Sequence, residues 1–446
     1  MRAIICLKVS FIAFCILSFI CFSANSAVVG EWNIGKVQKI PGSITFKGEI
    51  KIGIFGYLSG EFAHSGPAEI RGFFARFAQQ NEKGGLLGYK IIPVIKDTET
   101  NVLQSRQIMK KFVAEEVLCV MGGIHSGTVG AASKIAQEHG VIFLNSNSSS
   151  PQQIRKDAHR TKFVFDGNGN NFANGVLKAT LKAYPEGPIM MIAKPDDWGR
   201  NSVKGIAELV RRFNRMLPEE NQYFMVDGED MDFSGVFEKI KQIKPVIITT
   251  AISGPPSIKL KRLIERAEPN GPIAKAAWVA GQFDWPEARH GAVNVGGGTW
   301  LPNFETPGTR EFVEEYQRRY PGAELPGNVY HAAYFAADAF FTAVEELKTF
   351  ENVALVKYLE NLKVPAEKRM QHHDAYMNPQ THHLEQTIYA VEPDPKAKKN
   401  SKDVLKAISF VSPEEAEDKV KPGECRLEPY ESLKPWPRKS AFKLYK

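Results

Sequence analysis

Short apolar runs alternate with longer amphipathic stretches over most of the chain. The apolar runs are typical of buried strands, and the stretches between them repeat apolar residues with the period of a helix. Strand and helix follow one another from about residue 50 to about residue 280, which predicts βαβ units and parallel sheets. The predicted strands span residues 51–55, 90–96, 117–121, 141–144, 188–193, 222–226, 246–250 and 276–280. The predicted helices span residues 69–80, 101–115, 129–140, 202–217, 233–243, 257–267, 309–319, 328–349 and 353–362.

The first 26 residues have the pattern of an export signal. Arg2 and Lys8 flank a short positive start, residues 9–22 are almost wholly apolar, and Ala24 and Ser26 are small residues suited to cleavage. The apolar run is shorter than the roughly 20 residues that span a bilayer. No later segment is long and apolar enough to do so. We therefore expect residues 1–26 to be removed and the protein to be soluble in the periplasm.

Composition and charge narrow the function classes. The chain has 446 residues, of which 43% are hydrophobic, and this suits two or three domains with packed cores. Loss of Arg2 and Lys8 with the signal lowers the net charge from +7 to +5, and this charge is spread along the chain. No basic patch interleaved with aromatic residues is visible, so nucleic acid is not an expected partner.

Three of the five cysteines lie in the signal, which leaves Cys119 and Cys425. Cys119 falls in the predicted strand 117–121, where an inert buried thiol is the usual case. Export to an oxidising compartment also allows a disulfide between the two cysteines. The sequence leaves both alternatives open.

Two neighbouring strand ends carry serine-rich loops. A Gly-rich loop at residues 122–128 follows the strand 117–121, and residues 145–150 follow the strand 141–144. Ser126 and Ser150 are predicted N-caps, with Pro151 as the first residue of another helix. Such strand ends in an open α/β sheet can hold a carboxylate or another small anion. The alternative is that both serines are ordinary helix caps.

Signatures of catalysis and metal binding are weak. The loop 122–128 matches neither a nucleophile elbow, nor a phosphate loop, nor a dinucleotide fingerprint, and the adjacent His125 and Ser126 should point apart. We therefore expect no enzyme activity, no catalytic residue and no cofactor. The densest metal-capable group has no zinc-site spacing, so packing is the favoured role of its histidines. These are His372, His373, His382 and His383.

Several short motifs together resemble a known family over about residues 47–392. In their order and spacing they are similar to the periplasmic substrate-binding proteins of branched-chain amino-acid-type ABC transporters. The motifs are residues 52–60, 81–85, 96–100, 122–126, 150–151, 198–199, 232–234 and 330–338.

The resemblance implies an α/β fold of two doubly wound parallel-sheet lobes, joined by three crossovers, with the ligand in the cleft between them. Lobe 1 would comprise residues 47–166 and 302–365, and lobe 2 residues 167–301 and 366–392. Residues 393–446 would form a C-terminal extension packed on the body.

By position in the family, Ser126, Asn147 and Ser149 would receive a ligand carboxylate. The resemblance places Ser65 in the first-loop contact and either Ser253 or Gly254 near a contact of the second lobe. It places Trp198 at an aromatic wall, and the alternative for Trp198 is a side chain that covers a core edge. Amino-acid binders place an acid for the ligand ammonium after the strand 276–280. Phe283 stands at that position here, and Asp284 is one place further. Asp284 in the cleft would favour an amino acid, whereas Phe283 there would favour an amine-free aromatic or keto acid.

The implied function is that of a monomeric receptor that delivers a small carboxylate-bearing ligand to an ABC transporter permease. The ligand would be an amino acid, a related aromatic or keto acid, or an amide. Two alternatives use the same residues differently. One is a ligand-sensing protein that acts on a signalling receptor, and the other is a hydrolase that uses Ser126 or the histidine group.

Overall fold

The computed structural model describes residues 32–444 apart from several gaps. The gaps are residues 226–232, 253–255, 258, 261–262, 265–273, 283–293, 395, 398–404 and 439–441. The expected export signal and most of the expected helix 257–267 lie outside the described residues. Within the described part, no helix is long and apolar enough to cross a membrane.

The first lobe is built on a sheet of nine described strands. Its centre is parallel, with β1 paired to β2 and β3, β3 to β4, and β4 to β5. Helices α2 and α10 cover one face of this sheet and α3 and α4 cover the other, so apolar residues of β1 alternate between two cores. The bounds are β1 Gly48–Gly56, α2 Gly66–Glu82, β2 Tyr89–Asp97, α3 Val102–Ala114, β3 Val120–Met121, α4 Ser126–His139, β4 Phe143–Asn145, η2 Pro151–Ile154, β5 Lys162–Val164, α9 Thr309–Arg319, α10 Asn328–Leu347 and α11 Asn352–Glu360.

The second lobe is built on a sheet of seven described strands in the order β15-β14-β10-β9-β8-β6-β7. The strands from β7 to β10 are parallel, while β14 and β15 are antiparallel additions at one edge. Helices α5 and α6 pack on one face and α7 on the other. The bounds are α5 Gly169–Ala183, β6 Ile189–Ala193, α6 Asp197–Arg211, η3 Glu219–Asn221, β7 Gln222–Phe224, α7 Ser234–Ile243, β8 Ile247–Ala251, β9 Ala274–Gln282, β10 Asn294–Gly298, β14 Ile388–Pro393 and β15 Leu405–Val411.

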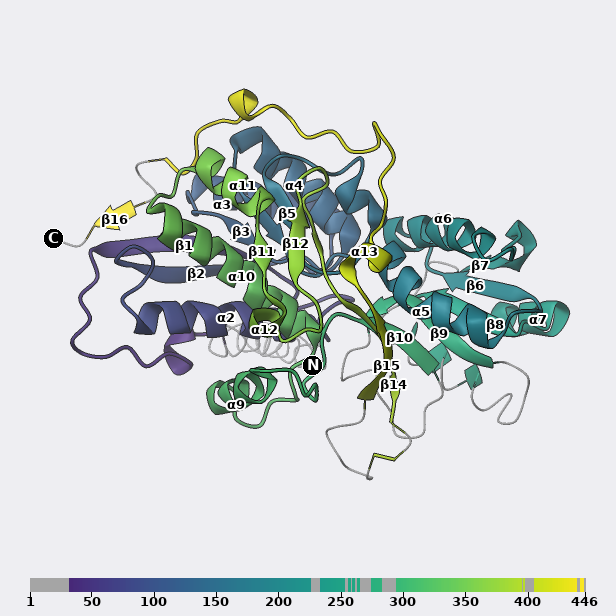
Figure 1. Ribbon diagram of the computed structural model, residues 1–446. Coiled ribbons are helices and arrows are strands. Elements are labelled where there is room, and N and C mark those ends of the chain that lie inside the picture. Colours follow the sequence, from purple (N-terminus) through teal and green to yellow (C-terminus); the bar gives the residue numbers. More distant parts are fainter. Residues whose placement is uncertain are drawn as a thin grey trace, which may run out of the picture.

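The expected two-lobed α/β fold is confirmed, and Figure 1 shows the two lobes side by side. The chain crosses between the sheets after β5, after β10 and again before β14. The third crossing lies further along than expected, because β12 (Ala375–Asn378) and β13 (His383–Glu385) extend the first sheet beyond β5. Residues 375–385 therefore belong to the sheet of lobe 1 and not to that of lobe 2. The short elements β11 (Lys363–Val364) and α12 (Ala366–Arg369) precede them.

The C-terminal segment packs on the body, as expected, and returns from the second lobe to the first (Figure 1). After β15, helix α13 (Pro413–Ala416) contacts α5, and η5 (Tyr430–Ser432) lies against lobe 1. The Trp436 indole donates to the carbonyls of Val117 and Leu118, and β16 (Phe442–Leu444) pairs antiparallel with β1. This return adds a fourth connection to the three expected crossovers. We call residues 412–438 the strap.

The two cysteines beyond the export signal are free thiols. Cys119 is buried next to β3, as predicted, and Cys425 lies in the strap, where its thiol donates to the carbonyl of Gln380 at 3.1 Å. The disulfide that the sequence left open is not formed.

Candidate functional site

The loops that follow β3 and β4 lie together at the carboxyl edge of the first sheet. The Ser126 hydroxyl accepts hydrogen bonds from the Ser148 hydroxyl and the Ser150 N–H, both at 3.1 Å. The Asn147 N–H donates to the carbonyl of Gly123 at 3.0 Å. Ser149 donates its hydroxyl to the carbonyl of Asn147 at 3.2 Å. The structure thus brings together the three residues predicted to receive a carboxylate, and it uses the Ser126 hydroxyl as the link between the loops.

The capping prediction is right for one loop and wrong for the other. Ser150 is the N-cap of η2, with its side chain accepting from the Gln152 N–H and Pro151 in the first helical position. This helix ends after one turn. The N-cap of α4 is His125, whose Nδ1 accepts from the Thr128 N–H, and Ser126 is the first helical residue. An imidazole nitrogen therefore caps this helix in place of the predicted serine hydroxyl.

Glu69, which is not among the predicted site residues, lies beneath both loops. Its side chain is 0% exposed, and Oε1 accepts from the Gly123 N–H at 3.0 Å, the Ser146 hydroxyl at 2.6 Å and the Asn147 amide at 3.3 Å. Gly123 has a φ of +131°, a conformation that L side chains rarely adopt, so a glycine is needed there. Burial raises the pKa of Glu69 to about 7, although these three hydrogen bonds act to lower it.

The second lobe contributes the end of β6 and the start of α6. Asp196 caps α6 by accepting from the Gly199 N–H at 2.8 Å, which starts the helix earlier than predicted. Trp198, in the first turn, packs against the core of the second lobe, and its buried indole nitrogen has no hydrogen-bond partner among the described residues. This position agrees with the alternative interpretation, a Trp that covers a core edge. Ser65 is the buried N-cap residue of α2, and its side chain makes no capping hydrogen bond.

Four polar contacts join the two lobes across this edge. Lys194, directly after β6, pairs with Glu61, and the Ser150 hydroxyl donates to Asp197 at 2.7 Å. The Gln152 amide donates to Asn201 at 3.0 Å, and Lys156 lies 3.5 Å from Asp197. The carboxyl ends of the parallel strands of both sheets therefore meet, as expected of a cleft between lobes.

His125 faces the charged side chains of this interface. Burial lowers its pKa, with Asp196 and Glu61 acting in the opposite direction. Because Nδ1 accepts from Thr128, the neutral ring carries its proton on Nε2 and can donate there. The predicted contacts Ser253, Gly254, Phe283 and Asp284 lie outside the described residues.

The four histidines near the C-terminus have separate hydrogen-bond partners. His382 is buried and bonds Glu360, while its neighbour His383 is buried and bonds Glu385. His372 bonds Tyr389 and His373 bonds Thr387. Among the described residues, no group of three or more His, Cys, Asp or Glu side chains is arranged to hold a metal ion. These contacts agree with the predicted packing role.

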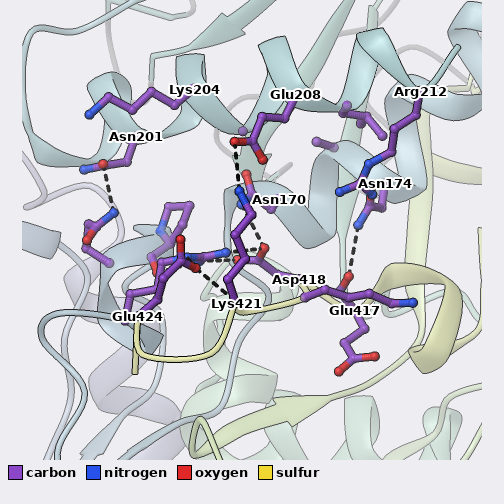
Figure 2. Close-up of a pocket in the computed structure, with 17 residues that line it drawn as sticks. Asn170, Asn174, Asn201, Lys204, Glu208, Arg212, Glu417, Asp418, Lys421 and Glu424 are labelled. Carbon is purple, nitrogen blue, oxygen red and sulfur yellow. Dashed lines mark hydrogen bonds and ion pairs between the residues drawn. The ribbon is translucent and has the colours of Figure 1, made fainter. Parts of the chain in front are cut away.

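A polar pocket lies at the first crossover, between the strap and helices α5 and α6 (Figure 2). Asp418 of the strap accepts from both terminal nitrogens of Arg155, at 2.6 and 2.8 Å, and from the amides of Asn168 and Asn170, at 3.2 and 2.9 Å. Arg155 follows η2 of the first lobe, whereas Asn168 and Asn170 begin α5 of the second. The strap thus binds both lobes at their first crossover.

Residues 49–400 match the profile of a family described as periplasmic binding proteins. The chain belongs to this family. The family is one of solute-binding proteins, not of enzymes.

The curated relatives point to one branch of the family. The chain is 27% identical over 197 residues to Leu/Ile/Val-binding protein homolog 2 of Brucella abortus, which covers 44% of this chain and 51% of that protein. It is also 27% identical over 203 residues to the Leu/Ile/Val-binding protein of Citrobacter freundii, covering 45% and 53%. The chain thus spans about half the length of the curated relatives it matches.

Solved structures share the fold over nearly their whole length. A leucine-, isoleucine-, valine-, threonine- and alanine-binding protein of Brucella ovis, in a closed conformation, superposes with a TM-score of 0.71 at 19% identity, covering 85% of this chain and 99% of that one. A Rhodopseudomonas palustris solute-binding protein in complex with 4-hydroxybenzoate gives a TM-score of 0.70 at 17% identity, covering 82% and 97%.

Proposed function

We propose that this protein is the periplasmic receptor of an ABC importer, that it binds a small carboxylate-bearing ligand between its lobes, and that it delivers this ligand to the permease as a monomer. One observation carries the proposal. Two loops with Ser126, Asn147 and Ser149, one of which leads into the N-terminus of α4, are held together opposite the second lobe. A helix start with serine hydroxyls is a favourable place for a carboxylate.

The names of the matched proteins support this ligand class. The relatives are described as binding leucine, isoleucine and valine, and one solved neighbour holds 4-hydroxybenzoate. Amino acids and benzoates share a carboxylate, which is the group that the two loops suit. The residue that faces the rest of the ligand distinguishes the two, since Asp284 in the cleft would pair with an ammonium and Phe283 would pack on a ring.

The export pattern of residues 1–26 and the family membership support a periplasmic location. Closure of the lobes over the ligand would create the form that the permease recognises. No chemical step on the ligand is required.

A thermal-shift screen of the protein without residues 1–26 tests the proposal. The panel is leucine, isoleucine, valine, their keto acids, benzoate and 4-hydroxybenzoate, each beside the compound in which its carboxylate is replaced by an amide. A bound ligand raises the melting temperature by mass action, so at least one carboxylate should do so and its amide should not. If no carboxylate on the panel shifts the melting temperature, or if ester substrates are turned over, the proposal is wrong.

Substitution of Ser126 by Ala tests the site. In the proposal, the Ser126 hydroxyl accepts from the Ser148 hydroxyl and the Ser150 N–H and donates its own O–H to the ligand carboxylate. Its removal should lower the affinity for the carboxylate found in the screen by about tenfold, as expected for one hydrogen bond to a charged group. Ser133→Ala is the matched control, because Ser133 is also buried in α4 and its hydroxyl bonds only the Gly130 carbonyl within the helix. Equal affinities of the two variants would remove Ser126 from the site.

A further inference from the structure

Glu69 joins the two ligand loops through a single carboxylate oxygen. Oε1 receives one donor from the loop after β3, Gly123, and two from the loop after β4, Ser146 and Asn147. The second of these donors, Asn147, is itself a predicted ligand contact. Displacement of this carboxylate would therefore move both loops at once.

The other carboxylate oxygen, Glu69 Oε2, is buried. Among the described residues it has no hydrogen-bond partner, and no Lys, Arg or His pairs with the carboxylate. Asn147 Oδ1 is also buried without a partner, and its amide group already donates to Oε1. A glutamine could accept the same three hydrogen bonds without burying an ionisable group, which is costly when charged. The three hydrogen bonds alone therefore do not explain why a carboxyl group, and not an amide, stands at this position.

We propose that Glu69 is a positioning residue of the anion site, whose neutral form holds the two loops for an anionic ligand and whose ionised form weakens that binding by repulsion. This inference rests on the proposed function, because it takes a carboxylate to bind at the loops. A proton on Oε2 turns this atom into a donor, and an acid and an amide can then bond in both directions. That proton is what would satisfy both Oε2 and Asn147 Oδ1.

The described titratable groups around Glu69 agree with this role, because Glu69 is, apart from His125, the one among them whose charge changes near neutral pH. Burial raises the pKa of Glu69 to about 7, so its charge changes within the physiological range. Tyr57, after β1, and Tyr330, in α10, keep their protons there, since burial raises the pKa of each phenol. His331 of α10 stays neutral because burial lowers its pKa. His125, two residues after Gly123, is the neighbour that could also titrate, and burial lowers its pKa too.

The first test is the pH dependence of affinity, measured by titration calorimetry with leucine and with 4-hydroxybenzoate between about pH 6 and about pH 8. Both probes keep their carboxylate ionised in this range. The native protein should bind more weakly as the pH rises above about 7, by up to about tenfold per pH unit, and should take up a proton on binding, as linkage requires. Glu69→Gln should bind with an affinity that does not change with pH and without proton uptake.

Ser146→Ala is the matched control, because it removes one hydrogen bond to Oε1 and keeps the carboxylate. It should bind more weakly than the native protein at low pH and keep a pH dependence, displaced to higher pH because the hydrogen bond that is lost lowers the pKa of Glu69 in the native protein. A purely structural role would make the two variants behave alike, and a slope retained in Glu69→Gln would assign the pH dependence to His125. Either result overturns the inference.

A ligand-free measurement separates this inference from the proposed function. If neither probe binds, the proposed function fails for these ligands. The inference about Glu69 is then tested without ligand: if Glu69 is protonated in the folded protein, the unfolding free energies of the native protein and of Glu69→Gln differ in their pH dependence. A raised folded-state pKa gives stability that is complete below the unfolded value of about 4.3 and is lost as the pH rises through about 7. Parallel stability profiles of the two proteins would overturn the inference.

Discussion

Asp418→Ala is the substitution that best tests the role of the strap. It removes the acceptor of two Arg155 nitrogens and of the Asn168 and Asn170 amides at the first crossover. Figure 2 shows Asp418 beside Asn170. The side chains of Asp418 and Arg155 are 6% and 14% exposed, so the pair is largely shielded from water. Removing one partner of a fully buried pair costs 3–5 kcal/mol.

The expected loss here is smaller, about 2–3 kcal/mol, because Arg155 keeps Glu424 at 3.3 Å and the Pro151 carbonyl at 3.0 Å. Urea unfolding at neutral pH should show this loss as a lower midpoint with an unchanged slope. Glu415→Ala is the matched control in α13, since its ion pair with Lys178 is exposed and should contribute less than about 1 kcal/mol.

A second readout uses the cysteine of the strap. In the protein without residues 1–26, Cys119 is fully buried, so a thiol reagent reaches Cys425 first. If Asp418 fixes the strap to the crossover, Cys425 should react faster in Asp418→Ala than in Glu415→Ala. Equal labelling rates together with a loss below about 0.5 kcal/mol would refute the reasoning.

Three further substitutions test other contacts. Trp436→Ala should cost about 3–5 kcal/mol in urea unfolding, because the indole is 3% exposed and donates to two carbonyls. Glu360→Gln should flatten the acid limb of the curve of unfolding free energy against pH. Burial acts to raise the pKa of Glu360, but hydrogen bonds from His382, Tyr430 and Arg160 lower it to about 2. The stabilisation by Glu360 is therefore present above the unfolded pKa of about 4.3 and is lost as the pH falls toward 2. Lys162→Met should raise stability most below about pH 7. Burial lowers the pKa of Lys162 to about 7, so the charged ammonium is unfavourable in the folded protein. Urea midpoints measured across this pH range report the gain.

Most of the fold was predictable because its strands and helices have clear periods. The predicted strand 90–96 and helix 309–319 agree with β2 and α9 to within one residue at each end. Strands β12 and β13 contain Asn, His and Glu in short runs, so no apolar pattern marks them. Their pairing depends on buried partners from distant segments, such as the Asp166 carbonyl, which accepts from His383. A single sequence does not show such contacts.

The candidate site was predictable in part. The two serine loops were found from strand ends and small residues, and the structure joins them. Glu69 was missed although a signal was present, since residues 69, 73 and 77 share one helix face and Phe73 and Phe77 are core residues. An acidic residue in the apolar stripe of a helix indicates a buried charge with a function or a partner. The choice of His125 over Ser126 as N-cap depends on loop geometry, which residue preference does not determine.

The pairing of β16 with β1 affects how the protein acquires its fold. Gly48 lies opposite Leu444, so the sheet of the first lobe includes segments from opposite ends of the described chain. Contacts this distant in sequence form slowly, because a very large loop must close first. In the proposed export the N-terminus emerges first, so Gly48–Ile50 of β1 would lack their partners on the side of β3 until β16 arrives. The parallel strands from β1 to β5 and from β6 to β10 each come from a continuous stretch of chain, so the parallel parts of both sheets can form before the strap and β16 join them.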